Sequence, residues 1–167
     1  SAQGQPGQAD SDVFALHREG ELACVALMPV REGRLQDPRG FSFRNVAEED
    51  DKLLGRLITQ LYSKTIRPPP EIVVPFPVAD ADLRAELLSD VAGRKVRFRV
   101  PKRGNRLRVL DVVKRNAKVR FDAEHSKAER AQRAMFGLQK SLRLSTLPRR
   151  IECYDNSNIS GSDPVGA

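Results

Sequence analysis

The stretch that decides the fold is DVFALHREGELACVALMPVREGRLQDPRGFSF, residues 12–43. Two apolar runs, 13–16 and 22–28, flank a turn that contains Gly20. Apolar runs of this length, separated by a glycine-containing turn, predict a β-hairpin. A second glycine-containing turn follows, and the alternation of apolar and polar residues at 41–43 continues or resumes a third strand. The stretch therefore predicts a three-stranded antiparallel meander.

A helix is predicted directly after the meander. Asn45 followed by Glu48 has the spacing of a capping box, in which the two side chains satisfy free backbone N–H groups. The acidic run 48–51 lies in the expected first turn, where the helix dipole favours negative charge, so it needs no catalytic explanation. The apolar residues at helical spacing are Leu53, Leu54, Leu57, Ile58 and Leu61.

The chain then alternates strands and helices. The unbroken apolar run 71–74 predicts a strand buried on both faces, and the alternation at 96–100 predicts a last strand that is half-buried or at an edge. Between them a helix is expected from an Asp80 cap to a Gly93 stop. One face of this helix is expected to carry Leu83, Leu87, Leu88 and Val91. A further helix is expected over about 105–117.

The expected order is three antiparallel strands, helix, strand, helix, strand, helix. A mixed five-stranded sheet with flanking helices is the natural packing, since the later strands need crossover connections. The predicted fold class is therefore α/β. This succession of elements is similar to the ribonuclease H-like fold.

Four segments are expected along the chain. Residues 1–11, rich in Gln, Gly, Ala and Pro, resemble an interdomain linker. Residues 12–122 form the ribonuclease H-like domain, and 123–148 form a helical connector. Residues 149–167 are expected to be the first strand and turn of a second, truncated ribonuclease H-like domain.

The connector is expected to contain a helix of its own. Ser126 and Glu129 have the spacing of another capping box. The apolar stripe along this helix consists of Ala131, Met135, Leu138 and Leu142. Such a stripe must dock on something, and the sequence leaves open whether it packs on the first domain or bridges to the next.

Positive charge is concentrated in one part of the chain. The net charge is +7, but residues 93–150 hold 19 Lys and Arg against 4 Asp and Glu, or +15, whereas the remainder is −8. Clustered cations favour a polyanion such as DNA, because phosphate neutralisation releases counterions. The alternative explanation is a solvated helical face.

Composition also bears on compartment. No apolar run approaches the roughly 20 residues that span a bilayer, and the start shows no signal pattern, so no membrane association is expected. Cys24 and Cys153 lie far apart without metal-ligand spacing, which favours reduced thiols in a cytoplasm. No small-molecule substrate is expected.

The candidate nucleic-acid contacts begin in the loop at 101–106, which joins the last strand to a helix. Backbone donors and the helix dipole would face whatever binds there, and phosphate suits them. The alternative is a loop that is basic for solubility. The candidate residues are Lys102, Arg103, Arg106, Arg108, Lys114, Arg115, Arg149 and Arg150.

The first domain is expected to be catalytically inactive. A working nuclease of this fold holds divalent metal with carboxylates from the first strand, the fourth strand and a helix. Residues 13–16 and 72–76 contain no acid, and Asp12 stands at the start of its strand rather than its centre. His17 and His125 have no nucleophile neighbour in sequence and are read as surface histidines.

A family resemblance covers nearly the whole chain from Asp12. The segment 150–161, RIECYDNSNISG, closely resembles the opening strand of the endonuclease domain of UvrC, the incising subunit of bacterial nucleotide excision repair. The motif of that family at this strand is an aromatic residue, Asp, a variable residue, Ser and then His or Asn, followed shortly by Gly. The upstream segments that agree in order and spacing are Asp12-Val13, Cys24-Val25, 72–75, 100–104 and Asn116-Ala117.

The resemblance implies roles that the residues alone do not establish. Asp155 matches the family's first metal-binding catalytic aspartate, in a domain that cuts 5′ of the lesion with Mg²⁺ or Mn²⁺. The remaining catalytic groups would lie beyond Ala167, and no metal is expected on this chain alone. Asn158 stands where many members have His, which leaves the role of that side chain open. DNA, UvrB and the UvrA–UvrB lesion-recognition pathway are the implied partners.

Two functional hypotheses follow, with a weaker third. The first is a non-catalytic DNA-binding or positioning scaffold of a UvrC-type excinuclease. The second is a protein-interaction module in which the helix carrying Met135 and Leu138 docks other domains or a repair partner. The third, an RNA-binding domain, lacks aromatic residues interleaved with the basic ones.

Overall fold

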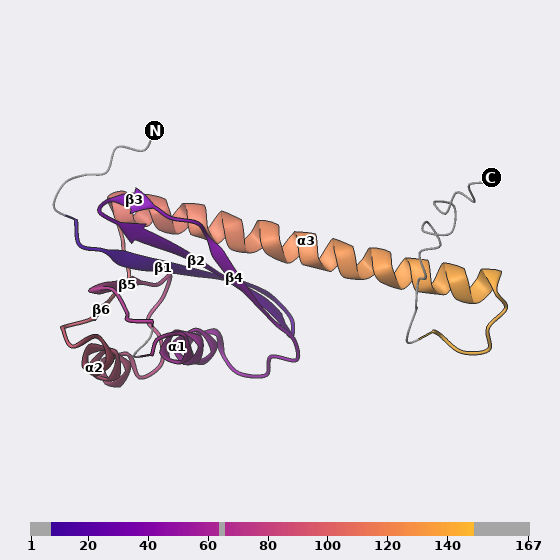
Figure 1. The fold of residues 1–167 in the computed structure, drawn as a ribbon, viewed down its shortest axis with the longest axis horizontal. Coiled ribbons are helices and arrows are strands. Elements are labelled where there is room, and N and C mark those ends of the chain that lie inside the picture. Colours follow the sequence, from indigo (N-terminus) through magenta and orange to yellow (C-terminus); the bar gives the residue numbers. More distant parts are fainter. Residues whose placement is uncertain (1–7, 64–65, 149–167) are drawn as a thin grey trace, which may run out of the picture. The chain divides into compact units, whose positions relative to one another are not determined.

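A computed structural model of the chain describes residues 8–63 and 66–148. The chain divides into two compact units, Ser1–His125 and Ser126–Ala167. The described part of the first unit is a sheet covered by helices on both faces (Figure 1). No helix within the described residues is long and apolar enough to cross a membrane.

The sheet is mixed. Its strands are β1 (Ser11–Glu19), β2 (Leu22–Arg31), β3 (Arg34–Leu35), β4 (Arg39–Phe43), β5 (Glu71–Val73) and β6 (Arg97–Arg99). The order is β3-β2-β1-β5-β6, and β4 also pairs with β2. The β1–β2, β2–β3 and β2–β4 pairs are antiparallel, whereas β5 is parallel to both β1 and β6. The predicted meander is thus confirmed, with its third strand in two pieces, and so are the buried strand β5 and the edge strand β6.

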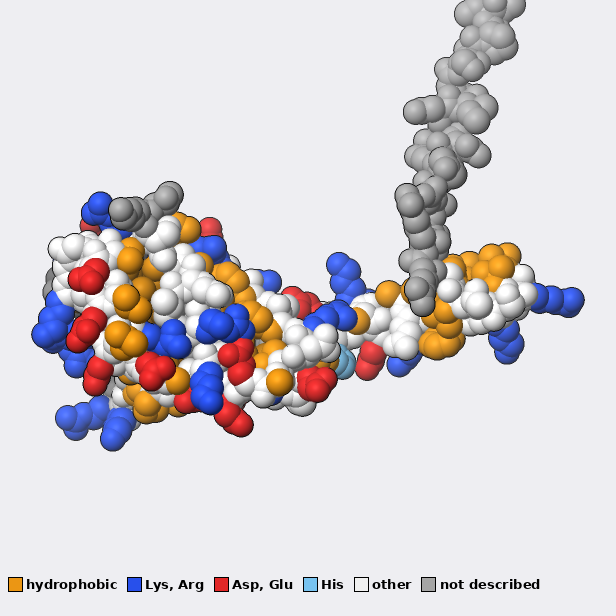
Figure 2. Space-filling view, turned by 90° about the horizontal axis from the view of Figure 1, so that it is seen from below, with side chains coloured by type: hydrophobic (Ala, Val, Ile, Leu, Met, Phe, Trp, Pro, Cys, Tyr) orange, Lys and Arg blue, Asp and Glu red, His pale blue; other side chains and the backbone are white. Residues whose placement is uncertain are grey.

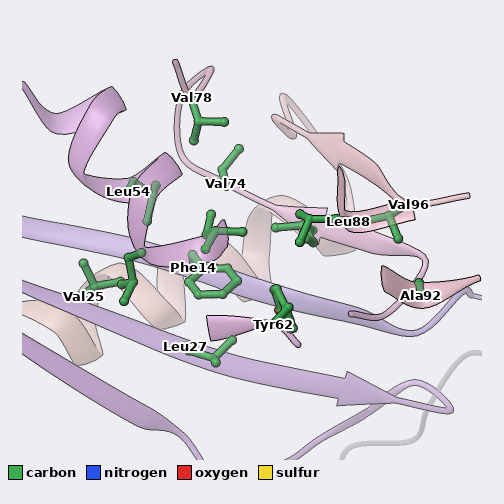
Figure 3. Packing of buried hydrophobic residues seen from close by; sticks show 13 residues of the cluster. Phe14, Val25, Leu27, Leu54, Tyr62, Val74, Val78, Leu88, Ala92 and Val96 are labelled. Atoms are coloured by element: carbon green, nitrogen blue, oxygen red, sulfur yellow. The ribbon is translucent and has the colours of Figure 1, made fainter. Parts of the chain in front are cut away.

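Three helices flank the sheet: α1 (Asp50–Leu61), α2 (Ala81–Ala92) and α3 (Asn105–Ser141). Helices α1 and α2 pack on one face through a cluster that includes Phe14, Ile72 and Leu88 (Figure 3). The first part of α3 packs on the other face through Leu110 and Val113. This arrangement is the α/β fold class expected from the order of elements.

The predicted capping box before α1 is wrong. Asn45 adopts a left-handed conformation with φ 55°, and the helix begins only after Glu49. The reason is tertiary, because the N–H of buried Val46 donates to the carbonyl of Glu21 in the β1–β2 turn. That bond holds the chain on the sheet, so the helix starts later.

The two ends of α2 were predicted at the right residues. Asp80 is the N-cap residue, although its side chain makes no capping hydrogen bond, and Gly93 is the C-cap in a left-handed conformation. The expected inward face of α2 is only partly right. Leu88 is buried, but the side chains of Leu83 and Leu87 are exposed, because a single stripe of this helix reaches the sheet and Leu88 and Ala92 occupy it.

The two helices expected at 105–117 and from Ser126 are one continuous helix, α3. Between Gly104 and Gly137 the sequence contains neither Gly nor Pro, the residues that most disfavour a helix interior. Ser126 therefore lies inside α3 and not at the start of a helix. The boundaries proposed at 122/123 and 148/149 stay predictions.

Candidate nucleic-acid interface

The candidate basic surface is built on the first part of α3. This part of the helix is amphipathic, and its buried side chains are Leu110, Val113, Ala117 and Phe121. These residues recur at helical spacing. Leu110, Val113 and Ala117 pack against β1, β2 and β5, and Phe121 contacts His17 of β1. The opposite side of the helix is therefore turned to solvent, whatever residues it carries.

Arg108 and Arg115 occupy that solvent-facing side. They are two helical turns apart, which corresponds to a rise of about 10 Å, and both are exposed. Lys114 is exposed beside Arg115. None of these three cations forms an ion pair with a carboxylate of the described residues. Their charge is thus available to an external anion.

The loop before α3 adds two more exposed cations, Lys102 and Arg103. Gly104 has φ 80°, a left-handed conformation that suits glycine, and α3 begins at Asn105. The first turn of the helix contains no acidic residue. Its free N–H groups and positive dipole end therefore lie next to Lys102 and Arg103 in sequence.

Arg106, unlike the other described candidates for DNA contact, is paired with a carboxylate of the same domain. Its Nε and Nη2 donate to the two carboxylate oxygens of Glu71 in β5, each at 2.9 Å. Arg99 Nε lies 3.5 Å from the same carboxylate. Glu71 is only 6% exposed, so its charge is held by two arginines with little help from water. Arg106 thus fixes the start of α3 to the sheet.

A second buried carboxylate, Asp12, lies on the neighbouring strand. Ser11 of β1 pairs with Glu71 of β5, and Asp12 pairs with Ile72, so both acids lie near the amino ends of parallel strands. The Tyr62 hydroxyl donates to Asp12 Oδ2 at 2.5 Å. Arg31 Nη2 lies 2.8 Å from Oδ1, although the angle there is not that of a hydrogen bond. Burial, and then the Asp12 charge, raises the pKa of Tyr62 far above its usual value.

These acids do not fit a divalent metal. Both oxygens of Glu71 accept hydrogen bonds from Arg106, Asp12 Oδ2 accepts one from Tyr62, and Asp12 Oδ1 lies 2.8 Å from the Arg31 guanidinium, so Mg²⁺ or Mn²⁺ would meet a cation beside each carboxylate. Within residues 8–63 and 66–148, no group of three or more His, Cys, Asp or Glu side chains is arranged to hold a metal. The predicted metal ligand Asp155, like Arg149 and Arg150, lies outside the described residues.

The structure also brings together two residues that the sequence left unrelated. His17 and His125 both contact the ring of Phe121, at centroid distances of 4.9 Å and 5.4 Å. His17 Nε2 is 3.1 Å from Glu19. Phe121 and His125 are four residues apart on α3, but no local spacing signals the contact with His17, which is on β1.

The opposite face of the sheet has a different charge pattern. Figure 2 looks onto the side where α1 and α2 lie, and acidic and basic side chains are mixed there. The acids Asp50 and Glu48 on this side are paired with Arg18 and Arg56. The unpaired cations described above belong to α3 and the loop before it.

Comparisons with known proteins agree with this architecture. The family model described as UvrC ribonuclease H-like domain matches residues 10–124, and the model described as UvrC RNase H endonuclease domain matches 139–167. The chain is 36% identical over 95% of its length to UvrABC system protein C of Protochlamydia amoebophila, and 38% identical over 96% to that of Anaeromyxobacter sp. strain Fw109-5. It covers only 26% and 22% of those proteins.

A solved structure shows the fold. The crystal structure of ribonuclease H2 from Pyrococcus horikoshii OT3 superposes with a TM-score of 0.53 at 11% identity, covering 72% of this chain and 76% of that one. The likeness extends to the arrangement of strands and helices and not to the sequence. The predicted ribonuclease H-like fold is thereby confirmed.

Proposed function

The chain belongs to the UvrC family, and from this premise we propose that it is a non-catalytic, DNA-positioning part of an excinuclease subunit that acts in nucleotide excision repair. In this role the first domain holds duplex DNA by its phosphates. The cutting groups belong to the domain whose family model begins to match at residue 139.

One observation carries the proposal: exposed cations of the domain are unpaired, whereas its buried acids are paired with arginines. Exposed Arg108, Lys114 and Arg115 have no carboxylate partner among the described residues, while the buried acids Asp12 and Glu71 are held by arginines. Free cations on one helix face suit phosphate, with counterion release as the driving force. Acids held by arginine suit a structural role.

The proposal assigns the remaining predicted residues by family membership. Asp155 is the first metal-binding aspartate of the 5′-incision nuclease, and Arg149 and Arg150 precede it as further DNA contacts. Bound Mg²⁺ or Mn²⁺ would neutralise charge on the attacking and leaving oxygens. In the full-length protein, UvrB and the UvrA–UvrB pathway bring this region to damaged DNA in the cytoplasm.

Fluorescence anisotropy with a labelled DNA duplex tests the interface. Arg108→Glu and Arg115→Glu should each weaken binding by about tenfold at low salt, because each reverses a phosphate contact. Lys52→Glu is the matched control, since it reverses one exposed charge on α1 across the sheet. Equal affinity of all three variants and the original chain would reject the α3 surface as the interface.

Nicking assays test the non-catalytic assignment separately. The chain incubated with supercoiled plasmid and Mg²⁺ should leave it intact. Metal-dependent nicking that disappears in Asp155→Ala would show that the chain is itself a nuclease.

A protein-interaction module is the second candidate, and one observation favours it. In the part of the chain from Ser126, the described residues expose several large apolar side chains, namely Phe136, Leu138, Leu142, Leu144 and Leu147. A surface of this kind marks an interaction site. DNA affinity that is unchanged by the double variant Lys102→Glu with Arg103→Glu would favour this second function.

A further inference from the structure

Helix α2 carries two parallel stripes on its solvent side. The acidic stripe is Asp82, Glu86 and Asp90, and the apolar stripe is Leu83, Leu87 and Val91. Residues four apart lie on one face of a helix, so each stripe runs straight along α2, one residue from the other. Leu83 is 58% exposed and Leu87 is 47% exposed. Neither belongs to the core cluster that α2 joins through Leu88 and Ala92.

The acidic stripe forms no ion pair within the described residues, although Arg67 lines the same hollow as Asp90, and Lys95, Arg97 and Arg99 line a depression together with Asp82. Among the described residues, no Lys or Arg forms an ion pair with Asp82, Glu86 or Asp90. The one cation of α2, Arg84, is turned inward, where it donates to the Ala79 carbonyl at 2.7 Å and to Thr59 Oγ1 at 2.7 Å.

The surface beside the stripes is hollowed. A depression of about 420 Å³ at the carboxyl end of α2 is lined by Arg67, Asp90, Val91 and Gly93. The apolar stripe therefore ends at a hollow that has room for a side chain. In helix–helix packing, side chains four residues apart form a ridge that fits a groove between side chains of the other helix. Leu83, Leu87 and Val91 have this spacing.

We propose that this face of α2 docks a basic amphipathic helix of a protein partner. The apolar seam of that helix packs on Leu83 and Leu87, and its flanking Lys or Arg side chains pair with Asp82, Glu86 and Asp90. Charge complementarity selects this occupant, because three unpaired acids repel DNA phosphates and anionic lipids alike. Helix-in-groove recognition uses the same spacing of anchors.

The docking face and the basic face of α3 lie on opposite sides of the sheet. Helix α2 packs with one core cluster and the first part of α3 with the other, as Figure 1 also shows. One domain thus binds a partner on one side without covering the cations on the other. The inference does not depend on the DNA-binding function and is tested without DNA.

Titration with a fluorescent peptide tests the proposal. The probe is an amphipathic peptide of about 18 residues with leucines at helical spacing flanked by lysines, and its control carries glutamates in place of the lysines. The lysine peptide should bind the chain and the glutamate peptide should not. Leu87→Ser and Glu86→Lys should each weaken binding of the lysine peptide by about tenfold.

Matched variants test whether the peptide binds this face of α2 specifically or binds exposed leucines and acids anywhere on the chain. Leu35→Ser removes another exposed leucine, on β3, and Asp37→Lys reverses another exposed acid, so neither should change the affinity. All four positions are exposed, and thermal unfolding should confirm that each variant folds. Equal binding of both peptides, or insensitivity to Leu87→Ser and Glu86→Lys, would overturn the proposal. Leu87-dependent self-association in sedimentation would assign the face to a second copy instead.

Discussion

Arg106 donates from Nε and Nη2 to both carboxylate oxygens of Glu71, each at 2.9 Å, and so connects the first turn of α3 to the buried strand β5. A two-bond pair of this kind fixes orientation as well as distance. The exposed cations of α3 are therefore presented from a helix whose start is held on the sheet. Their direction depends on an arginine that is itself not free to bind phosphate.

Glu71→Gln should destabilise the domain. The change leaves Arg99 and Arg106 without their charge partner. Because 38% of the Arg106 side chain is exposed to water, we expect the free energy of unfolding to fall by about 2 kcal/mol, which is less than the roughly 3–5 kcal/mol lost when a fully buried pair is broken. Urea unfolding measures it. The matched control is Asp122→Asn, which removes the exposed pair with Lys118 and should cost at most about 0.5 kcal/mol. Equal losses in both variants would contradict this account.

Tyr62→Phe should lower the free energy of unfolding by about 1.5–3 kcal/mol, because the buried Asp12 carboxylate loses the hydrogen bond that the Tyr62 hydroxyl donates to it. Burial and Asp12 raise the pKa of Tyr62, so the folded tyrosine stays protonated where the unfolded one ionises. This stabilisation is complete below about pH 10 and is lost as the pH rises further. The difference in free energy of unfolding between the original chain and Tyr62→Phe should therefore be constant below about pH 10 and decrease as the pH rises above it. A difference that does not decrease would refute the assignment.

Cys24 should react slowly with thiol reagents. Burial, followed by the charge of Glu124, raises the pKa of the Cys24 thiol, so little of the reactive thiolate forms. In a Cys153→Ser variant, Cys24 is the one thiol left, because the chain has two cysteines. Labelling by DTNB at about pH 8 should be slow in buffer and fast in urea above the unfolding midpoint. Rapid labelling of the folded chain would contradict the burial of this side chain.

Salt dependence should identify the phosphate contacts. A cation that neutralises one duplex phosphate contributes about 0.9 to the slope of log affinity against log salt. Arg108→Ala and Arg115→Ala should each reduce the slope by about that amount, and Lys52→Ala should leave it unchanged. If the slope stays the same in the first two variants, these arginines do not contact phosphate.

The elements whose signal is local were predictable. The meander, the buried strand β5, the edge strand β6 and the stop of α2 at Gly93 follow from apolar periodicity and from residues that favour special backbone angles. Helix starts were less predictable. Asn45 has the right chemistry for a cap, but a backbone bond from Val46 to Glu21 keeps that part of the chain on the sheet.

The exposed leucines of α2 show a similar limit. The apolar periodicity of α2 predicted a buried face but did not show which of the leucines contact the sheet. The packing of α2 on the sheet buries Leu88 and leaves Leu83 exposed. The continuity of α3 is the opposite case. The spacing of Ser126 and Glu129 predicted a new helix start, but the sequence between 105 and 136 contains no Gly or Pro, and the helix continues through Ser126.

By itself the sequence determined the fold class, the order of strands and helices, the basic segment and the family. Each of these follows from local patterns of residues or from the order of short motifs along the chain. Only the tertiary structure decided which charges are free. Arg106 and Glu71 are 35 residues apart, and Asp12 and Tyr62 are 50 apart. Such pairs form when the sheet brings distant strands and helices together, and burial then fixes the partner, since a charge removed from water must be compensated. Arg108 and Arg115 are exposed on α3, and neither forms an ion pair with a carboxylate of the described residues.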